Sequence, residues 1–274
     1  MTTITAAVIQ IRGDRGLEGN LAAAGHWLAQ AAAAGARLAV VPENFAYFCQ
    51  RPGEGPARAE ATPAGPARRF LAAKAREHGI WLLGGTIPVQ DSPEGKPTAT
   101  SLLLSPEGVE VARYDKIHLF DVAVEETGRS YRESDDYRHG QEVVVARLPE
   151  CVLGLSVCYD LRFPELYRRQ ATLGAQVLTA PSAFTATTGA AHWELLLRAR
   201  AVENLSFMLA ANLADRQHPK TPTWGGSAII DPWGRVLASL DDEEGMACAE
   251  LDLDAQAKIR GNMPALSHRR LFVV

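Results

Sequence analysis

The sequence predicts a mixed α/β fold in which helices cover a core of β-sheet. Short apolar, β-rich runs alternate with helical segments along the whole length of 274 residues. The order contains both strand pairs and strand–helix–strand units, which is typical of a domain with helices outside a sheeted core. Neither a repeat of fixed period nor an interdomain linker interrupts this order, so we expect a single domain over residues 1–274.

The first half of the chain supplies five predicted strands and two predicted helices. Gly35 ends the first helix, and Gly79 ends the second, where a helix C-terminus favours a left-handed residue. Pro106–Gly108 is typical of a hairpin turn. The predicted strands are Thr3–Ile9, Leu38–Val41, Ile80–Thr86, Thr100–Ser105 and Val109–Tyr114, and the predicted helices are Asn20–Ala34 and Pro66–His78.

The second half continues with another hairpin, two helices and several short strands. The predicted strands are Val143–Leu148, Val152–Cys158, Val177–Ala180, Phe207–Asn212, Ser227–Asp231, Val236–Leu240 and Met246–Leu251, and the predicted helices are Pro164–Leu173 and Ala191–Glu203. Two long segments, Arg51–Gly65 and Glu125–Gly140, are predicted to be loops. Loops of this length are often functional, although a surface excursion is the alternative.

The net charge and the cysteine content limit the partners and the cellular compartments that we expect for this protein. The formal net charge of −4 argues against nucleic acid as the main partner. No apolar run is long enough for a membrane helix, and Met1–Gln10 does not resemble a signal peptide, so we expect no membrane association. The four cysteines, at 49, 151, 158 and 248, form no CxxC pair, which indicates free thiols and a cytoplasmic location.

Cofactor motifs are missing from the sequence. The seven histidines form no HxH, HExxH or Cys/His cluster with the spacing of metal ligands. There is also no Gly-rich phosphate-binding loop. We therefore expect neither a metal nor another cofactor, and we expect His118 to be a hydrogen-bonded structural residue.

Three reactive side chains share one position, just beyond the C-terminal end of an apolar strand. They are Glu43, Lys116 and Cys158. In open α/β sheets the ligand crevice lies beyond these strand ends, so the three side chains can converge although they are far apart in the sequence. A thiol that attacks an amide carbonyl needs a base and a positive neighbour, which Glu43 and Lys116 supply. Solvated surface charges remain the alternative for Glu43 and Lys116.

The segments around these residues resemble the motifs of the nitrilase superfamily of carbon–nitrogen hydrolases. The matching segments are Val41–Asn44, Tyr114–Leu119 and Val157–Glu165, in the family's order and spacing. The resemblance implies that Glu43 is the general base, Lys116 the electrostatic stabiliser and Cys158 the nucleophile. It also implies a second glutamate, Glu133 in Tyr131–Asp135, that positions the substrate and Lys116.

Within the superfamily the sequence is most similar to the branch of deaminated glutathione amidase and ω-amidase. The segments that carry this similarity are Lys116–Val122, Tyr131–Asp135, Pro181–Phe184, Thr187–Leu195 and Arg198–Asn204. The resemblance implies a four-layer αββα sandwich and a homodimer or higher oligomer formed through the helices around Pro164–Leu173 and Ala191–Glu203. Two departures, Ala99 and Gly226, leave the triad untouched but put the substrate in doubt.

The predicted activity is hydrolysis of a small carboxylate-bearing amide through a thioester on Cys158. Alternatives within the superfamily are a nitrilase, an N-carbamoyl amino acid hydrolase and an aliphatic amidase, and a non-catalytic binding protein is a further one. Candidate substrate contacts lie close to Glu43 and Cys158 or follow the strand Val177–Ala180. Core packing is an equal alternative for the side chains other than Arg162, for which the alternative is an ion pair with Glu165 or Glu133. These candidates are the backbone N–H of Tyr159, the guanidinium of Arg162, and Phe184, Thr185, Thr188, Tyr47 and Phe48.

Overall fold

The computed structural model describes residues 2–48, 53–61, 65–91, 94–124 and 128–271. Its larger sheet has the strand order β18-β1-β2-β4-β6-β5-β3, and β7 also pairs with β6. Strands β1, β2 and β4 are parallel, whereas β18 is antiparallel to β1. The strands are β1 (Thr3–Gln10), β2 (Leu38–Val41), β3 (Glu60–Ala61), β4 (Trp81–Gly84), β5 (Ile87–Gln90), β6 (Thr98–Leu104), β7 (Glu110–Asp115) and β18 (Gly245–Asp252).

The second sheet has the strand order β10-β11-β12-β13-β16-β17. Its central strands β11, β12 and β13 are parallel, and antiparallel strands flank them on both sides. The strands are β10 (Val145–Arg147), β11 (Val152–Gly154), β12 (Val177–Thr179), β13 (Phe207–Ala210), β16 (Ala228–Ile230) and β17 (Val236–Ser239). A further short pair joins β14 (Ala214–Asp215) to β15 (Thr223–Trp224).

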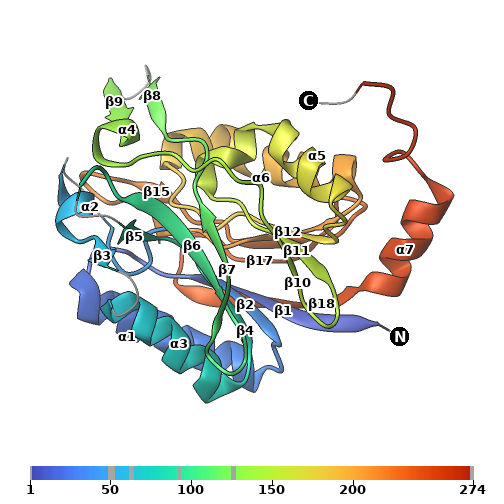
Figure 1. Ribbon diagram of the computed structural model, residues 1–274, viewed down its shortest axis with the longest axis horizontal. Coiled ribbons are helices and arrows are strands. Elements are labelled where there is room, and N and C mark those ends of the chain that lie inside the picture. Colours follow the sequence, from blue (N-terminus) through green and yellow to red (C-terminus); the bar gives the residue numbers. More distant parts are fainter. Residues whose placement is uncertain (1, 49–52, 62–64, 92–93, 125–127, 272–274) are drawn as a thin grey trace.

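Helices cover the outer face of each sheet, which gives four layers in the order α-β-β-α (Figure 1). Helices α1 (Gly16–Ala33) and α3 (Pro66–His78) lie on the larger sheet, and α5 (Pro164–Thr172) and α6 (Ala186–Asn204) lie on the second. Strand β1 explains the layering, because alternate side chains of a strand point to opposite faces. Its Ile4, Ala6 and Val8 pack between the sheets, whereas Ala7 and Ile9 pack against α1 and α3. The predicted sandwich is confirmed.

Most predicted elements are present, with shifted ends. Helix α3 matches its prediction, and Gly79 after it has the expected left-handed backbone, with φ of +62°. Strand β11 stops at Gly154, and Cys158 instead begins a 3-10 helix, Cys158–Arg162. The C-terminal helix α7 (Leu253–Asn262) was not predicted; the side chain of Asp252 caps its N-terminus by accepting from the N–H of Ala255.

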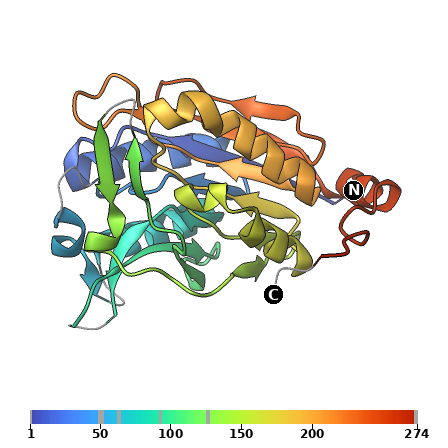
Figure 2. The same cartoon turned by 90° about the horizontal axis from the view of Figure 1, so that it is seen from above.

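Both predicted long loops contain regular structure. The segment 51–65 holds α2 (Glu54–Ala57) and β3, and the segment 125–140 holds β9 (Arg129–Arg132) and α4 (Glu133–Asp136). Strand β9 pairs with β8 (Asp121–Val124) alone. This β8–β9 hairpin and α7 lie at opposite ends of the molecule in both views (Figure 2).

The state of the cysteines and the character of the helices bear on two of the sequence predictions. Cys151, Cys158 and Cys248 are free thiols, as predicted, whereas Cys49 lies outside the described residues. None of the helices that the structure describes has the length and apolar character needed to span a bilayer.

Candidate active site

The structure brings Glu43, Lys116, Cys158 and Glu133 together in one cluster, although they come from four separate segments. Glu43 follows β2, Lys116 follows β7, Cys158 begins the 3-10 helix after β11, and Glu133 begins α4. The ammonium Nζ of Lys116 lies 2.8 Å from Glu43 Oε1 and 2.9 Å from Glu133 Oε2. Glu43, Lys116 and Cys158 are all buried.

A tight turn beyond β2 aims Glu43 into the cluster. Asn44 has a left-handed backbone, with φ of +57°, and its N–H donates to Thr86 Oγ1 at 3.0 Å. Gly85, with φ of +45°, lies against the carbonyl of Pro42, which a Cβ atom would overlap. The glycine therefore allows β4 to approach the base-bearing turn closely.

Glu43 is held at both carboxylate oxygens. Oε1 accepts from Lys116, and Oε2 accepts from the backbone N–H of Ala183 at 2.8 Å. The thiol of Cys158 faces the same cavity, and the charge of this carboxylate raises the pKa of the thiol. Glu43 is thus placed to exchange a proton with the sulfur while remaining fixed by two other donors.

Lys116 keeps its proton because two carboxylates surround it. Burial alone lowers the pKa of this amine, but the charges of Glu133 and Glu43 outweigh burial and raise the pKa well above its usual value. Lys116 is therefore a permanent cation, which can stabilise negative charge that develops beside it.

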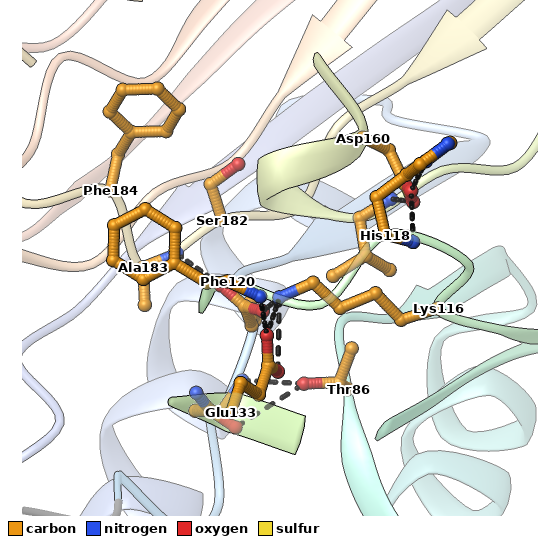
Figure 3. Close-up of polar contacts among 12 residues, drawn as sticks. Thr86, Lys116, His118, Phe120, Glu133, Asp160, Ser182, Ala183 and Phe184 are labelled. Carbon is orange, nitrogen blue, oxygen red and sulfur yellow. Dashed lines mark hydrogen bonds and ion pairs between the residues drawn. The ribbon is translucent and has the colours of Figure 1, made fainter. Parts of the chain in front are cut away.

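Glu133 links the β8–β9 hairpin to Lys116. Besides its ion pair, Glu133 Oε2 accepts from the N–H of Phe120 at 2.7 Å (Figure 3). Burial raises the pKa of Glu133, and the charge of Glu43 adds to this rise, while Lys116 opposes it. The first residue of α4 is thereby fixed against the cluster rather than exposed at the surface.

Cys158 occupies a sharp turn of the kind that presents a nucleophile. Its φ is +48°, in the left-handed region, and its N–H donates to the carbonyl of Pro181 at 3.0 Å. Burial raises the pKa of the thiol well above its usual value, the charge of Glu43 raises it further, and Lys116 acts in the opposite sense. The resting sulfur is therefore a thiol, which must transfer its proton when it attacks.

Asp160 is a buried residue of the site that we did not single out from the sequence. Its Oδ2 accepts from Val157 N–H at 2.8 Å and from Tyr114 Oη at 2.7 Å. Its Oδ1 accepts from the backbone N–H of His118 at 3.1 Å and lies 2.7 Å from His118 Nδ1 (Figure 3). His118 is thus hydrogen-bonded, as predicted. The signal available was the position of Asp160, two residues beyond Cys158.

A cavity of about 620 Å³ opens onto Cys158. Of the predicted substrate contacts, Tyr159, Phe184, Thr185, Thr188 and Phe48 line this cavity. The β8–β9 hairpin and α4 contribute much of the remaining wall. The described residues that line it besides these and the cluster are Asn44, Phe120, Ser130, Tyr131, Arg132, Asp135, Asp136, Tyr137, Ala183, Lys220, Thr221, Pro222 and Thr223.

Tyr47 and Arg162 lie outside the cavity lining, in contrast to our expectation. Tyr47 is buried in the core beside α1 and α3, with the Arg58 guanidinium 5.7 Å from its ring. Arg162 lies over the ring of Phe184 at 5.3 Å and beside His192 Nδ1 at 3.3 Å. Arg162 therefore packs against Phe184, which lines the cavity, whereas Tyr47 belongs to the core.

Within the described part of the chain, one group of potential metal ligands lies apart from the cavity lining. Asp14, Asp215 and His218 have ligand atoms within 4.8 Å of one another. The Nδ1 atom of His218 already accepts the N–H of Thr221 at 2.9 Å, and neither carboxylate is buried. None of these three residues lines the cavity, although His218 accepts from Thr221, which does.

The fold and the cluster together define the class of protein. A four-layer sandwich places a thiol beside a carboxylate and a permanent cation, which is an arrangement for acyl transfer. The carbon–nitrogen hydrolase family model matches residues 5–260, and the chain belongs to this family. It is therefore an enzyme of the carbon–nitrogen hydrolase class, of the amidase type.

Individual relatives agree with this assignment. The chain is 39% identical over 275 residues to a deaminated glutathione amidase of Synechocystis, which covers 98% of this chain and 99% of the relative. It is 36% identical to the human omega-amidase, with 98% of this chain and 96% of the relative covered. The solved nitrilase and fragile histidine triad fusion protein of Caenorhabditis elegans superposes with a TM-score of 0.91 at 37% identity, over 98% of this chain and 66% of that one.

Proposed function

We propose that this protein hydrolyses the C–N bond of a small carboxylate-bearing amide through a thioester on Cys158. The substrate class that we propose is deaminated glutathione or a related ω-amide of a keto-dicarboxylate. One observation carries the proposal: Lys116 Nζ lies 2.8 Å from Glu43 Oε1, and Glu43, Lys116 and Cys158 line the same cavity. The base, the cation and the nucleophile thus meet at one end of the cavity.

The first half of the reaction forms the thioester. Glu43 removes the thiol proton as the sulfur attacks the amide carbonyl, and the C–S bond forms while the carbonyl oxygen gains negative charge. The ammonium of Lys116 stabilises this oxyanion. The backbone N–H of Tyr159, in the first turn of a 3-10 helix, is the second donor that we propose. The protonated Glu43 then gives its proton to the leaving nitrogen, and the C–N bond breaks.

The second half releases the acid. Glu43, again a carboxylate, removes a proton from water as the water oxygen attacks the thioester carbonyl. The C–S bond breaks, and the proton on Glu43 returns to the thiolate. Water is consumed, and one carboxylic acid and one ammonia or amine are produced. The contact between Glu43 and Ala183 N–H keeps the carboxylate in place through both halves.

Glu133 supports this chemistry by fixing Lys116. Both of its oxygens contact Nζ, at 3.1 and 2.9 Å, and its second contact, from Phe120 N–H, fixes the carboxylate itself. We propose that Glu133 also contacts the amide nitrogen of the substrate, because it lines the cavity beside Cys158.

The cavity supports a substrate of modest size with an anionic end. Its volume of about 620 Å³ lies within the range of small-molecule sites. Arg132, which pairs with Asp135 in the same wall, and Lys220 are the residues that we propose for a substrate carboxylate away from the reacting amide. The deaminated glutathione amidase and omega-amidase names of the relatives agree with this choice. Free Cys151, Cys158 and Cys248 support the cytoplasmic location that we propose.

An ammonia-release assay with matched cysteine variants tests the function. We expect the wild type to hydrolyse deaminated glutathione or ω-amides of keto-dicarboxylates, and we expect Cys158→Ala to lose activity by about 10⁴-fold or more. Cys151→Ala is the control, because burial raises the pKa of that thiol to about 12 and leaves it unreactive. Mass spectrometry of the trapped acyl-enzyme should place the added mass on Cys158.

The same panel contains the outcomes that contradict the proposal. Nitriles, N-carbamoyl amino acids and simple aliphatic amides are assayed beside the keto-acid amides. Tenfold faster turnover of any of these would replace the proposed substrate class. Turnover by Cys158→Ala at a comparable rate would overturn the thioester mechanism itself.

A further inference from the structure

We propose that Asp160 is a positioning residue that fixes the turn bearing Cys158 against the strand end bearing Lys116. The inference rests on the proposed function, because it concerns the alignment of that nucleophile and that cation. The side chain of Asp160 is fully buried, with 0% of its surface exposed. A buried carboxylate needs several donors to offset the loss of water, and Asp160 has four.

These donors come from both catalytic segments. Val157 directly precedes Cys158 and donates to Asp160 Oδ2. Tyr114 and His118 lie two residues before and two residues after Lys116 in the sequence. One carboxylate therefore connects Val157, next to the nucleophile, to two residues that lie two positions from the cation. The contacts with Tyr114 and His118 join residues 46 and 42 positions apart.

The turn at Cys158 needs constraints from the residues around it. A left-handed backbone at a residue with a side chain is unfavourable and persists only when its surroundings enforce it. Asp160 closes the turn in both directions, because its carboxylate accepts from Val157 N–H and its own N–H donates to Val157 O at 3.0 Å. Without this carboxylate, the φ of +48° at Cys158 would lose a main constraint.

The partners of Asp160 extend the connection. Burial raises the pKa of Tyr114 well above its usual value, and the Asp160 charge adds to this, so the phenol remains a donor. The Tyr114 oxygen in turn accepts from the N–H of Ile117 at 3.3 Å, next to Lys116. The His118 ring stacks on Phe163, with ring centres 3.6 Å apart, at the far end of the 3-10 helix. The lysine segment thus contacts this helix at its middle residue and just beyond its C-terminal end.

The test replaces the carboxylate and one of its donors separately. Asp160→Asn keeps the size of the side chain but replaces one of its two acceptor oxygens by an NH₂ group. The donors that contact two oxygens in the wild type then have one acceptor oxygen. Displacement of a reacting group by about 1 Å can reduce a rate by about 100-fold, so we expect kcat to fall by about 100-fold with KM changed less than about threefold. Tyr114→Phe removes one of the four bonds, and we expect a loss of about tenfold in kcat with the same unchanged KM.

Gln256→Leu is the control for a general loss of buried hydrogen bonds. Gln256 is buried in α7, and its Nε2 donates to Gln176 O and Leu205 O, outside the cavity lining. All variants are assayed well below their melting temperatures, which are measured in parallel. A loss of kcat in Gln256→Leu as large as in Tyr114→Phe would overturn the proposal, as would a kcat in both Asp160→Asn and Tyr114→Phe within threefold of wild type. If Asp160→Asn does not fold, Tyr114→Phe decides alone.

A second readout needs no substrate. The rate of iodoacetamide alkylation at Cys158, followed on its own peptide by mass spectrometry, reports the surroundings of the sulfur. We expect its pH profile to shift in Asp160→Asn and Tyr114→Phe, because the sulfur moves relative to Lys116 and Glu43, and to stay unchanged in Gln256→Leu. Unchanged profiles in both site variants would overturn the positioning role. If no amide is hydrolysed by the wild type, the proposed function fails, whereas the alkylation profile still decides the role of Asp160.

Discussion

Protonation at Cys158 is decided by burial and by two neighbouring charges. The resting thiol is neutral because burial and the charge of Glu43 outweigh the effect of Lys116 on its pKa. This arrangement keeps the nucleophile inactive until a carbonyl is in place, when proton transfer to Glu43 and attack by sulfur occur together. Glu43 thus opposes ionisation in the free enzyme and assists it during the reaction.

Glu43→Gln separates these two effects. The neutral amide removes the negative charge and the hydrogen bond that raise the pKa of the Cys158 thiol, while Lys116 still lowers it. The thiol pKa therefore falls, and we expect alkylation of Cys158 by iodoacetamide to move to lower pH and to become faster near neutrality. Amide hydrolysis should nevertheless fall by about 10³-fold, because no base remains.

The wild type and Cys158→Ala are the controls for this alkylation measurement. The wild-type profile should rise only at alkaline pH, and Cys158→Ala should show no modification on that peptide. An alkylation profile of Glu43→Gln at the same or higher pH than wild type would contradict the assigned role of the Glu43 charge.

At the scale of single residues, the sequence predicts the reactive side chains but not the residues that hold them in place. Glu43, Lys116 and Cys158 were found because each follows an apolar run, which is a local signal. The contacts of Asp160 with His118 and Tyr114 join residues 42 and 46 positions apart, so only the folded chain reveals them. Tyr47 and Arg162 were misplaced because proximity in sequence to Glu43 and Cys158 does not say on which side of the cavity wall a side chain lies.

At the scale of elements, strands with a clear apolar pattern were predictable from the sequence, whereas the β8–β9 hairpin was not. Strand β1 is buried along most of its length, and β6 and β7 pair around the turn expected at Pro106–Gly108. Strands β8 and β9 have four residues each and pair only with one another, so they carry no core-facing periodicity. The hairpin nevertheless lines the cavity with Ser130 and Tyr131.

The junction of β2 and β4 gives a prediction about stability. Gly85→Ala places a methyl group into the carbonyl of Pro42 at a φ of +45°, so we expect it to lower the free energy of unfolding by more than about 3 kcal/mol. Gly79→Ala is the control, because its φ is +62° with nothing within 4 Å of the added atom, and we expect only about 1–2 kcal/mol. Denaturant titration measures both.

The activity of the two glycine variants provides a further check. Because the Pro42 carbonyl directly precedes Glu43, Gly85→Ala should also reduce kcat in the protein that remains folded, whereas Gly79→Ala should not. Equal destabilisation by the two substitutions would refute the close approach of β4 to the base-bearing turn.

The molecule as a whole exposes apolar side chains on one outer layer. Leu195 and Val202 of α6 are exposed, as are Trp233, Val236 and Leu237 around the β16–β17 hairpin. The two groups are adjacent, since Arg198 of α6 donates to Gly234 O at 2.9 Å. Clusters of exposed apolar side chains commonly mark protein–protein contacts. They lie on the layer where we expect a second copy of this chain to bind.

Leu195→Glu tests this assembly. Leu195 is 68% exposed, so the charge should leave the fold of a monomer intact while it disfavours burial in an interface. We expect sedimentation velocity to show a homodimer or higher oligomer for the wild type and a monomer, or a much weaker oligomer, for Leu195→Glu. Val111→Glu, on the exposed face of β7, is the control and should sediment as wild type does. A monomeric wild type would refute the proposed assembly.

The imbalance of charges around Lys116 also bears on how a catalytic cycle ends. Two carboxylates, Glu43 and Glu133, contact a single ammonium, and the thiol beside them is uncharged at rest. An amide arrives with a neutral reacting group, whereas hydrolysis leaves a newly formed anion in the same place. Like charges repel strongly where little water screens them, so the reaction converts a ligand that the cluster tolerates into one that it expels.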